Sequence, residues 1–157
     1  MTKEMFSEKY LTYKVMVFQI SYAYLRNIED AEEATLDSFM KFYKSAKKFQ
    51  SVNHEKNYLI RVTINTAKDY LKKIKALPLN EEVHGVYDDN GELDKHYVWA
   101  VVDELEGKYK DVIYLRYTAD LPYKDIASIL KISEALARKY HEIAIKTLRE
   151  LIGGNYA

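Results

Sequence analysis

The chain has 157 residues, of which 48% are hydrophobic, and this composition predicts a folded protein rather than a disordered one. It contains no cysteine, which excludes disulfide bonds, cysteine-ligated zinc and thiol catalysis. The longest apolar run, residues 15–20, is far too short to cross a membrane, and no apolar signal segment follows Met1. We therefore expect a cytoplasmic protein that is not inserted into a membrane.

The net charge is zero, but the charges are distributed unevenly along the chain. Residues 1–75 hold 14 Lys and Arg against 9 Asp and Glu, residues 76–97 hold 1 against 6, and residues 98–157 hold 9 of each. A basic segment followed by an acidic one indicates a charged partner, even though the net charge of the whole chain is zero.

Three helices are predicted in the first half of the chain. Residues 6–25 are too apolar for a helix with one buried side, so we expect neighbours on two sides. After a break, Asp30 can cap a second helix that runs to about Phe49. A polar loop begins at Gln50, and a third helix with a lysine-rich end is expected from residue 57 to about residue 75.

Residues 77–97 interrupt the helical pattern. They contain Pro78, Gly85, Gly91 and a concentration of acidic side chains. Because twenty irregular residues are unusual inside one compact domain, this stretch predicts a flexible acidic linker between domains at 1–76 and 98–157. The sequence thus predicts an all-α protein made of two small helical domains.

The second domain has the pattern of a helix-turn-helix. Its four expected helices are residues 98–105, 109–117, 122–130 and 134–152, the last one ended by Gly153 and Gly154. Within residues 121–133, the small Ala127 lets two helices approach, and Ser133 can cap the helix that follows. Such a helix places its first residues at base edges in the major groove. The alternative is a plain helical hairpin.

Two segments of the first domain resemble the extracytoplasmic-function (ECF) family of RNA polymerase sigma factors. Residues 30–43, Asp-Ala-Glu-Glu-Ala-Thr-Leu-Asp-Ser-Phe-Met-Lys-Phe-Tyr, resemble the helix with which the family binds the polymerase β′ subunit. Residues 58–73 resemble the helix that reads and melts the minus-ten element. The helix-turn-helix resembles the domain that reads the minus-thirty-five element. The resemblance covers residues 8–75 and 98–151 in the family's order.

This resemblance implies three groups of binding residues. The polymerase-binding residues are Asp30, Glu32, Glu33, Leu36, Asp37, Phe39 and Met40. The residues for the minus-ten element are Asn53, Tyr58, Arg61, Asn65, Lys68, Lys72 and Lys73. The residues for the minus-thirty-five element are Lys124, Ser133, Glu134, Arg138 and Lys139. The implied partners are core RNA polymerase, promoter DNA and an anti-sigma factor, and no cofactor is implied.

The residue types are consistent with strand opening, which needs a basic surface for phosphates and a pocket for an unstacked base. The lysines near the end of the third helix supply the charge. The polar loop 50–57, with Tyr58 behind it, is the candidate pocket. In the alternative interpretation the lysines are a solvated face and Tyr58 belongs to the core.

The match to the family is weaker at several positions. Leu36 and Asp37 stand where the family has Gln and Glu. In the last helix, Ile143 and Ile145 stand where basic or polar residues are common, and they either pack on the helix 98–105 or form an apolar patch for a partner. Of the basic residues, Arg138 suits a guanine edge or a phosphate and Lys139 a phosphate.

Two functions remain in competition. The first is an ECF sigma factor that binds core polymerase and directs promoter recognition and transcription initiation. The second is a sigma-like DNA- or polymerase-binding regulator that does not open promoters itself, which the weakly basic last helix suggests. An enzyme is not expected, because the four histidines are isolated in the sequence and no catalytic triad, metal-ligand spacing or phosphate-binding loop is present.

Overall fold

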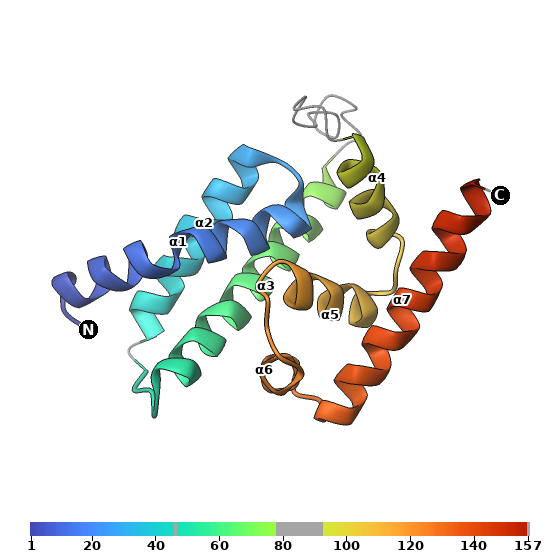
Figure 1. The fold of residues 1–157 in the computed structure, drawn as a ribbon. Coiled ribbons are helices and arrows are strands. Elements are labelled where there is room, and N and C mark those ends of the chain that lie inside the picture. The colour runs from blue at the N-terminus through green and yellow to red at the C-terminus, as the bar shows by residue number, and fades with distance from the viewer. Residues whose placement is uncertain (46, 78–92, 157) are drawn as a thin grey trace. The chain divides into compact units, whose positions relative to one another are not determined.

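The computed structural model describes residues 1–45, 47–77 and 93–156, and in these ranges every element of regular secondary structure is a helix (Figure 1). The predicted all-α class is confirmed. The chain divides into two compact units, Met1–Val86 and Tyr87–Ala157, and each is described here by itself. The predicted linker, 77–97, lies mostly outside the described residues, so its flexibility stays a prediction.

The first helix, α1, spans Lys3–Leu25 and begins three residues earlier than predicted. Thr2 accounts for the difference, because its side-chain Oγ1 accepts a hydrogen bond from the backbone N–H of Met5 at 3.2 Å. At the other end Arg26 adopts the left-handed conformation with φ 53°, and its N–H donates to the carbonyl of Tyr22. The left-handed residue ends the helix.

The second helix, α2, spans Ile28–Ser45. Asn27 caps it by accepting a hydrogen bond from the N–H of Asp30 at 2.9 Å, so the prediction that Asp30 is the cap was wrong. Asp30 instead lies in the first turn, where a carboxylate interacts favourably with the helix dipole. The helix also ends before the predicted Phe49, because that ring leaves the helix and stacks on Phe42 at 5.9 Å.

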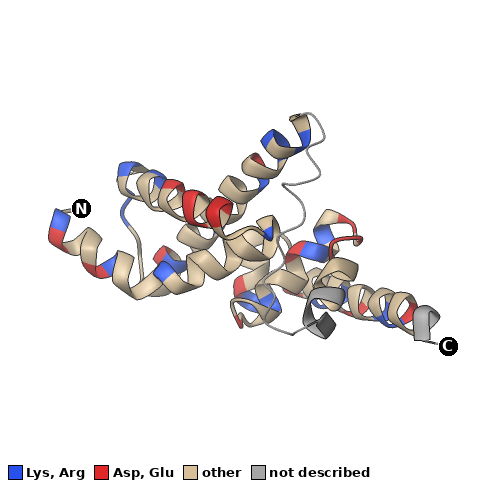
Figure 2. Ribbon diagram, turned by 90° about the horizontal axis from the view of Figure 1, so that it is seen from above, with Lys and Arg blue, Asp and Glu red and all other residues tan. Residues whose placement is uncertain are grey.

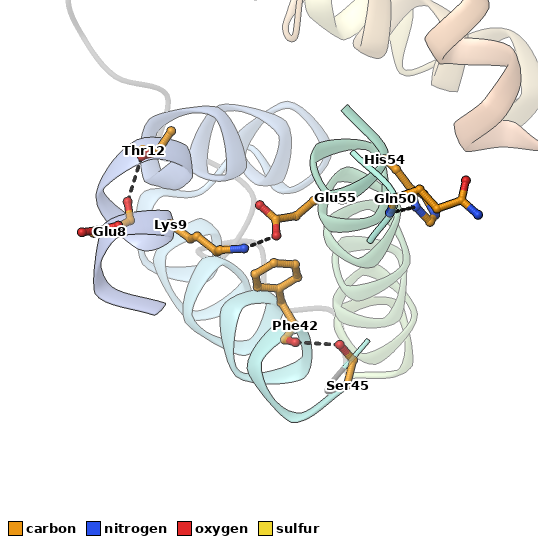
Figure 3. Close-up of polar contacts among 8 residues, drawn as sticks. All are labelled: Glu8, Lys9, Thr12, Phe42, Ser45, Gln50, His54 and Glu55. Atoms are coloured by element: carbon orange, nitrogen blue, oxygen red, sulfur yellow. Dashed lines mark hydrogen bonds and ion pairs between the residues drawn. The ribbon is translucent and has the colours of Figure 1, made fainter. Parts of the chain in front are cut away.

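The third helix, α3, spans Val52–Ala76 and includes most of the segment predicted as a polar loop. Ser51 caps it by accepting a hydrogen bond from the N–H of His54 at 3.0 Å, and the His54 ring in turn accepts one from the N–H of Gln50 at 3.2 Å (Figure 3). The prediction of a loop over 50–57 was therefore wrong. Because Ser51 caps the helix at this point, the polar residues that follow it form the first turns of α3.

The core of the first unit lies among these three helices. Its buried centre consists of Tyr13, Val17, Phe39, Phe42 and Leu59. Helix α1 packs against both α2 and α3, which confirms the expectation of neighbours on two sides. Each fully buried apolar side chain of this size contributes about 1.5–3 kcal/mol relative to an exposed one.

An ion pair fastens α1 to the beginning of α3. The ammonium group of Lys9 binds the carboxylate of Glu55, and both side chains are largely shielded from solvent (Figure 3). A glutamate in the first turn of α3 also complements the helix dipole. The pair holds in place the segment that the sequence pattern had assigned to a solvent-facing loop.

Within its described residues, 93–156, the second unit contains four helices, α4 (Leu93–Val102), α5 (Gly107–Tyr117), α6 (Tyr123–Leu130) and α7 (Glu134–Tyr156). Helix α4 lies several residues before its predicted position. It ends at Val102 because the next residues form a turn in which the N–H groups of Glu104 and Leu105 bond to carbonyls three residues back. The Asp103 carboxylate in this turn accepts a hydrogen bond from the hydroxyl of Tyr114, which ties the turn to α5.

Helices α6 and α7 form the predicted helix-turn-helix. Lys131 ends α6 in the left-handed conformation, and the N–H of Ile132 donates to the carbonyl of Ala127 at 3.0 Å. Ser133 then caps α7 by accepting from the N–H of Leu136 at 3.1 Å, which confirms its predicted role. Pro122 precedes α6 as its N-cap residue and does not occupy the first helical turn.

Helix α7 does not end at the two glycines. It continues through Gly153 and Gly154 to Tyr156, so the predicted end was wrong. Glycine in a helix costs about 1 kcal/mol relative to alanine, but its backbone can still adopt the helical conformation. It favours a helix end where the residue takes up the left-handed conformation. The buried positions Ala137, Ala144 and Leu148 hold α7 against its neighbours, as predicted from their spacing.

Candidate polymerase-binding and DNA-binding surfaces

The outer face of α2 combines carboxylates with apolar side chains. Acidic residues occupy the first half of the helix, and the lysines follow towards its end (Figure 2). Leu36 and Met40 are 57% and 48% exposed, and Asp37 is exposed beside them. Glu32 and Glu33 are also exposed, and Asp30 is half-buried. Six of the seven residues predicted to bind polymerase are thus accessible to a partner.

Phe39 is the exception, because its side chain is only 1% exposed. Its ring packs edge-on against Tyr10 at 4.9 Å and Phe6 at 6.2 Å, both from α1. The prediction of a direct polymerase contact at Phe39 was therefore wrong. With 3.6 residues per turn, a helix that exposes Leu36, Asp37 and Met40 turns Ser38 and Phe39 towards the core, so Phe39 packs beneath the exposed face.

A hydrogen bond joins the α2 face to α3. The hydroxyl of Tyr70 donates to Oδ2 of Asp37 at 2.5 Å. Burial and the neighbouring Asp37 carboxylate raise the pKa of Tyr70 well above its usual value, so the hydroxyl keeps its proton. The ammonium of Lys73 lies 5.6 Å from the centre of the same ring. Tyr70 was in neither of the candidate sites predicted from the sequence.

A groove of about 530 Å³ lies alongside this hydrogen bond. It brings residues predicted for polymerase together with residues predicted for the minus-ten element. Its lining consists of Asp37, Met40, Lys41, Lys44, Asp69, Tyr70, Lys72 and Lys73. Lys41 is held by a hydrogen bond to Oγ1 of Thr66 at 3.1 Å. The sequence could not reveal this groove, since α2 and α3 contribute to it from segments about 30 residues apart.

A second groove, of about 430 Å³, lies between α1 and the outer face of α2. Its lining consists of Tyr10, Lys14, Val15, Phe18, Glu32, Thr35 and Leu36. In the sequence, this groove is indicated only by two apolar residues of α1, Leu11 and Val15, which the structure shows to be exposed. Such residues interrupt the one-sided apolar pattern of a surface helix, and the packing of α1 on both α2 and α3 does not account for these two.

The predicted minus-ten residues form a stripe along α3. Tyr58, Arg61, Asn65, Lys68 and Lys72 follow one another at spacings of three and four residues, which places them on one face of a helix. At 1.5 Å per residue the stripe is about 21 Å long. Asn53 and Lys73 are exposed beyond its two ends. A solvated helix face could carry the same charged residues. The position of Tyr58, in the core or at the surface, therefore bears on whether this face binds nucleic acid.

Tyr58 lies partly in the core and not behind an open loop. Its ring is 5.3 Å from that of Phe49 and 6.3 Å from that of Phe42, and the ammonium of Lys47 lies 4.6 Å above it. Glu55 of the supposed loop is itself buried. The open loop on which the predicted pocket for an unstacked base depended is therefore replaced by the first turns of α3, and Tyr58 is half-buried.

The predicted minus-thirty-five residues lie around the turn between α6 and α7. Lys124, Ser133, Glu134, Arg138 and Lys139 are all exposed. The guanidinium of Arg138 donates to the Glu134 carboxylate at 2.9 Å, one helical turn earlier. Ile143 and Ile145 are both half-buried, so each has one side against the unit and one side free.

His141 lies at the centre of a polar network next to these residues. Its Nε2 and Nδ1 atoms are 2.8 Å and 2.9 Å from the hydroxyls of Tyr117 and Tyr123, which belong to α5 and α6. Burial and the nearby Arg116 lower the pKa of the imidazole. This histidine looks isolated in the sequence, because its partners are 24 and 18 residues away.

Two absences limit the chemistry of the part of the chain that the structure describes. There, no group of three or more His, Cys, Asp or Glu side chains is arranged to hold a metal ion. No helix within the same residues has the length and apolar character needed to cross a membrane. The described surfaces are instead polar helix faces and grooves, which define a helical protein that binds macromolecules through a helix-turn-helix and a second three-helix unit.

Comparisons with known proteins place the chain within this class. The family model for Sigma-70 region 2 matches residues 10–76, and the model for Sigma-70, region 4 matches residues 95–148. RNA polymerase sigma factor SigV of Bacillus subtilis is 27% identical over 116 residues, which cover 71% of this chain and 69% of SigV. ECF RNA polymerase sigma factor SigW of the same organism is 26% identical over 161 residues, covering 88% and 86%.

The fold is also similar to that of a solved sigma factor. The sigma factor RpoE of Bartonella quintana, solved in complex with the anti-sigma factor NepR, superimposes with a TM-score of 0.75 at 16% identity, covering 96% of this chain and 98% of RpoE. The two matched models and the curated relatives show that the chain belongs to the ECF family of RNA polymerase sigma factors. It is a transcription initiation factor that recognises promoters together with core RNA polymerase, and the alternative of a regulator without promoter opening is not favoured.

Proposed function

We propose that three surfaces share the work of promoter recognition. The outer face of α2 binds core RNA polymerase, the stripe along α3 engages the minus-ten element, and the beginning of α7 engages the minus-thirty-five element. In this assignment residues 1–76 act as sigma domain 2, residues 77–97 as the linker and residues 98–157 as sigma domain 4. The observation that carries it is that Leu36 and Met40, two large apolar side chains, are exposed beside Asp37 on one face of α2 while the opposite face is buried.

The α2 face has the composition of a binding interface. Leu36 and Met40 provide an apolar centre, and the surrounding carboxylates provide a polar rim. The expected partner surface therefore combines apolar side chains with basic ones. Because Asp37 is already oriented by Tyr70, it reaches a basic partner group without having to be ordered first.

The α3 stripe has the chemistry of a surface that follows a nucleic-acid backbone. Lys68, Lys72 and Lys73 supply charge for phosphates, and Asn65 supplies an amide that can read a base edge. The ring of Tyr58 is half-buried, with Phe49 beside it and the ammonium of Lys47 over it, so a base that stacks on this ring would have to displace Lys47. We therefore assign phosphate binding to the stripe first and base recognition to Asn65.

The beginning of α7 is the surface for the minus-thirty-five element. Ser133 ends the turn, and Arg138 and Lys139 project from the next turns of an exposed helix. A helix presented in this way fits the major groove. Lys124 of α6 is placed to bind a phosphate at the edge of that groove.

Several finer properties belong to the same proposal. The protein acts in the cytoplasm with RNA polymerase, has no catalytic activity of its own and needs no cofactor. By analogy with RpoE, which was solved in complex with the anti-sigma factor NepR, an anti-sigma factor is its expected regulator. The exposed apolar residues of α1 and α2 that line the second groove are available to such a partner.

The test is transcription in vitro from a pool of AT-rich promoter fragments, with core polymerase alone and with the protein added. We expect new, promoter-specific starts, and we expect them to be lost when Leu36 and Asp37 are both replaced by alanine. The matched control replaces Met5 and Glu104, one exposed apolar and one exposed acidic residue outside the α2 face. Initiation that survives the α2 double substitution would contradict the assignment of that face.

A further inference from the structure

The ring of Tyr123, at the beginning of α6, lies next to the arginine expected to read the minus-thirty-five element. We propose that Tyr123 is a positioning residue that orients Arg138 for the major groove, an inference that rests on the proposed function of α7. Tyr123 is half-buried and does not itself need to touch DNA. Its effect on recognition passes through the guanidinium of Arg138.

The contact geometry restrains an otherwise mobile side chain. The Arg138 guanidinium carbon lies 5.2 Å from the centre of the Tyr123 ring, within the range of a cation–π interaction. The same guanidinium donates to Glu134 at 2.9 Å, although the Arg138 side chain is 60% exposed. An exposed arginine has a large rotamer entropy to lose on binding, so interactions that reduce its freedom beforehand favour the bound state.

The ring that holds Arg138 is itself fixed by contacts with two other helices, α5 and α7. Its hydroxyl is hydrogen-bonded to Nδ1 of His141 in α7, and Nε2 of that imidazole is hydrogen-bonded to Tyr117 in α5. A second guanidinium, that of Arg116, lies 4.6 Å from the ring centre and donates to the carbonyl of Leu121 at 2.9 Å. A ring with so many fixed neighbours is a rigid support, which a solvated tyrosine would not be.

The surroundings also explain why a tyrosine suits this place. Arg116 and Arg138 carry like charges and lie close to the same ring. The negative face of an aromatic ring attracts a guanidinium, so the Tyr123 ring interacts favourably with both. The hydroxyl fixes the orientation of the ring through His141. A leucine or methionine of similar size would fill the space without attracting either guanidinium.

The test uses the full chain assembled with core RNA polymerase. The probe is a promoter fragment that the wild-type holoenzyme has selected from a pool of random DNA duplexes. A matched fragment has its minus-thirty-five base pairs scrambled, and the ratio of the two dissociation constants measures discrimination. We expect Tyr123→Leu to reduce discrimination about 2- to 5-fold, the size of an exposed cation–π interaction. Tyr123→Phe keeps the ring and should retain discrimination within about twofold of wild type.

Two further variants guard against a trivial loss of folding. Tyr123→Met removes the ring and places a longer, unbranched and adaptable side chain in its space, and it should behave like Tyr123→Leu. Tyr109→Leu is the matched control, because it removes a ring that lies near the ammonium of Lys108 and not near Arg138. The fluorescence of Trp99, whose ring lies 5.4 Å from that of Tyr114, reports whether α4 and α5 keep their packing.

A double-substitution cycle separates positioning from a structural role. In an Arg138→Ala background, replacing Tyr123 by leucine should cause no further loss of discrimination. An equal loss in both backgrounds would overturn the inference, and so would a Tyr123→Phe variant as weak as Tyr123→Leu. If Arg138→Ala alone left discrimination unchanged, the proposed role of Arg138 would fall, and this inference with it. The two failures are therefore distinguishable.

Discussion

The hydroxyl of Tyr70 in α3 donates a hydrogen bond of 2.5 Å to the carboxylate of Asp37 in α2, across 33 residues of sequence. Asp37 belongs to the face assigned to core polymerase, whereas Tyr70 lies among the lysines assigned to the minus-ten element. The two surfaces are thus connected by one bond. A change at either residue is expected to reach the function of the other.

Removing this hydroxyl should weaken polymerase binding while leaving the fold intact. Tyr70→Phe keeps the ring next to Lys73 but frees the Asp37 carboxylate. We expect the dissociation constant for core polymerase to rise about 2- to 5-fold, because a hydrogen bond to an exposed charged group is worth about 0.5–1 kcal/mol here, less than in a buried site. Fluorescence anisotropy of labelled protein titrated with core polymerase measures it. Tyr43→Phe, six residues further along α2 from Asp37, is the control and should bind as wild type.

Truncation of Phe39 should affect stability and truncation of Leu36 should not. Phe39→Ala removes a buried ring, and large-to-small changes of this kind cost about 3–5 kcal/mol. Leu36→Ala changes an exposed side chain, so its effect on the free energy of unfolding should stay within about 0.5 kcal/mol. Urea unfolding followed by far-ultraviolet circular dichroism distinguishes them. Equal stability of the two variants would show that Phe39 is not in the core.

The lysines of α3 should act on affinity, whereas Asn65 should act on sequence preference. Removing one lysine that binds a phosphate makes the plot of log affinity against log salt less steep by about 0.9. Lys72→Gln should therefore weaken holoenzyme binding to all promoters equally and flatten the salt dependence by about that amount. Asn65→Ala should change the preferred minus-ten bases with little change of slope. Lys3→Gln, at the exposed beginning of α1, is the control for the removal of one positive charge.

The stability of the second unit should depend on pH through His141. Burial and Arg116 lower the pKa of the folded imidazole, while Glu142 opposes them. Above the pKa of the unfolded chain the histidine is neutral in both states, and its two tyrosine hydrogen bonds contribute fully. As the pH falls below about 6.5 the unfolded chain takes up a proton first, so the folded state loses stability.

The measurement compares wild type with His141→Phe by urea unfolding between pH 7.5 and pH 5. Trp99 is the single tryptophan of the chain and lies in α4, so its fluorescence follows the second unit. The stability advantage of wild type over the variant should be largest at pH 7.5 and should shrink towards pH 5. An advantage that stayed constant, or grew on acidification, would contradict a lowered pKa at His141.

The helical class and the helix-turn-helix could be predicted from the order of the amino acids alone. The spacing of Ala137, Ala144 and Leu148 predicted the buried side of α7, and Ser133 predicted its beginning. These features are local, because a helix period and an N-cap involve residues within one or two turns of each other. The order of the three family-like segments is also a property of the sequence, and it indicates the sigma factor family without reference to the fold.

Which side chains of these helices face inward, and which residues they meet, depends on the packing of distant segments. Phe39 and Leu36 belong to one motif, yet α1 covers the first and leaves the second exposed. Glu55 looks like a loop residue until Lys9, 46 residues away, draws it into an ion pair. His141 and Tyr70 acquire roles only through partners on other helices. A helix period is set within one segment, whereas burial and pairing depend on how segments distant in sequence come together.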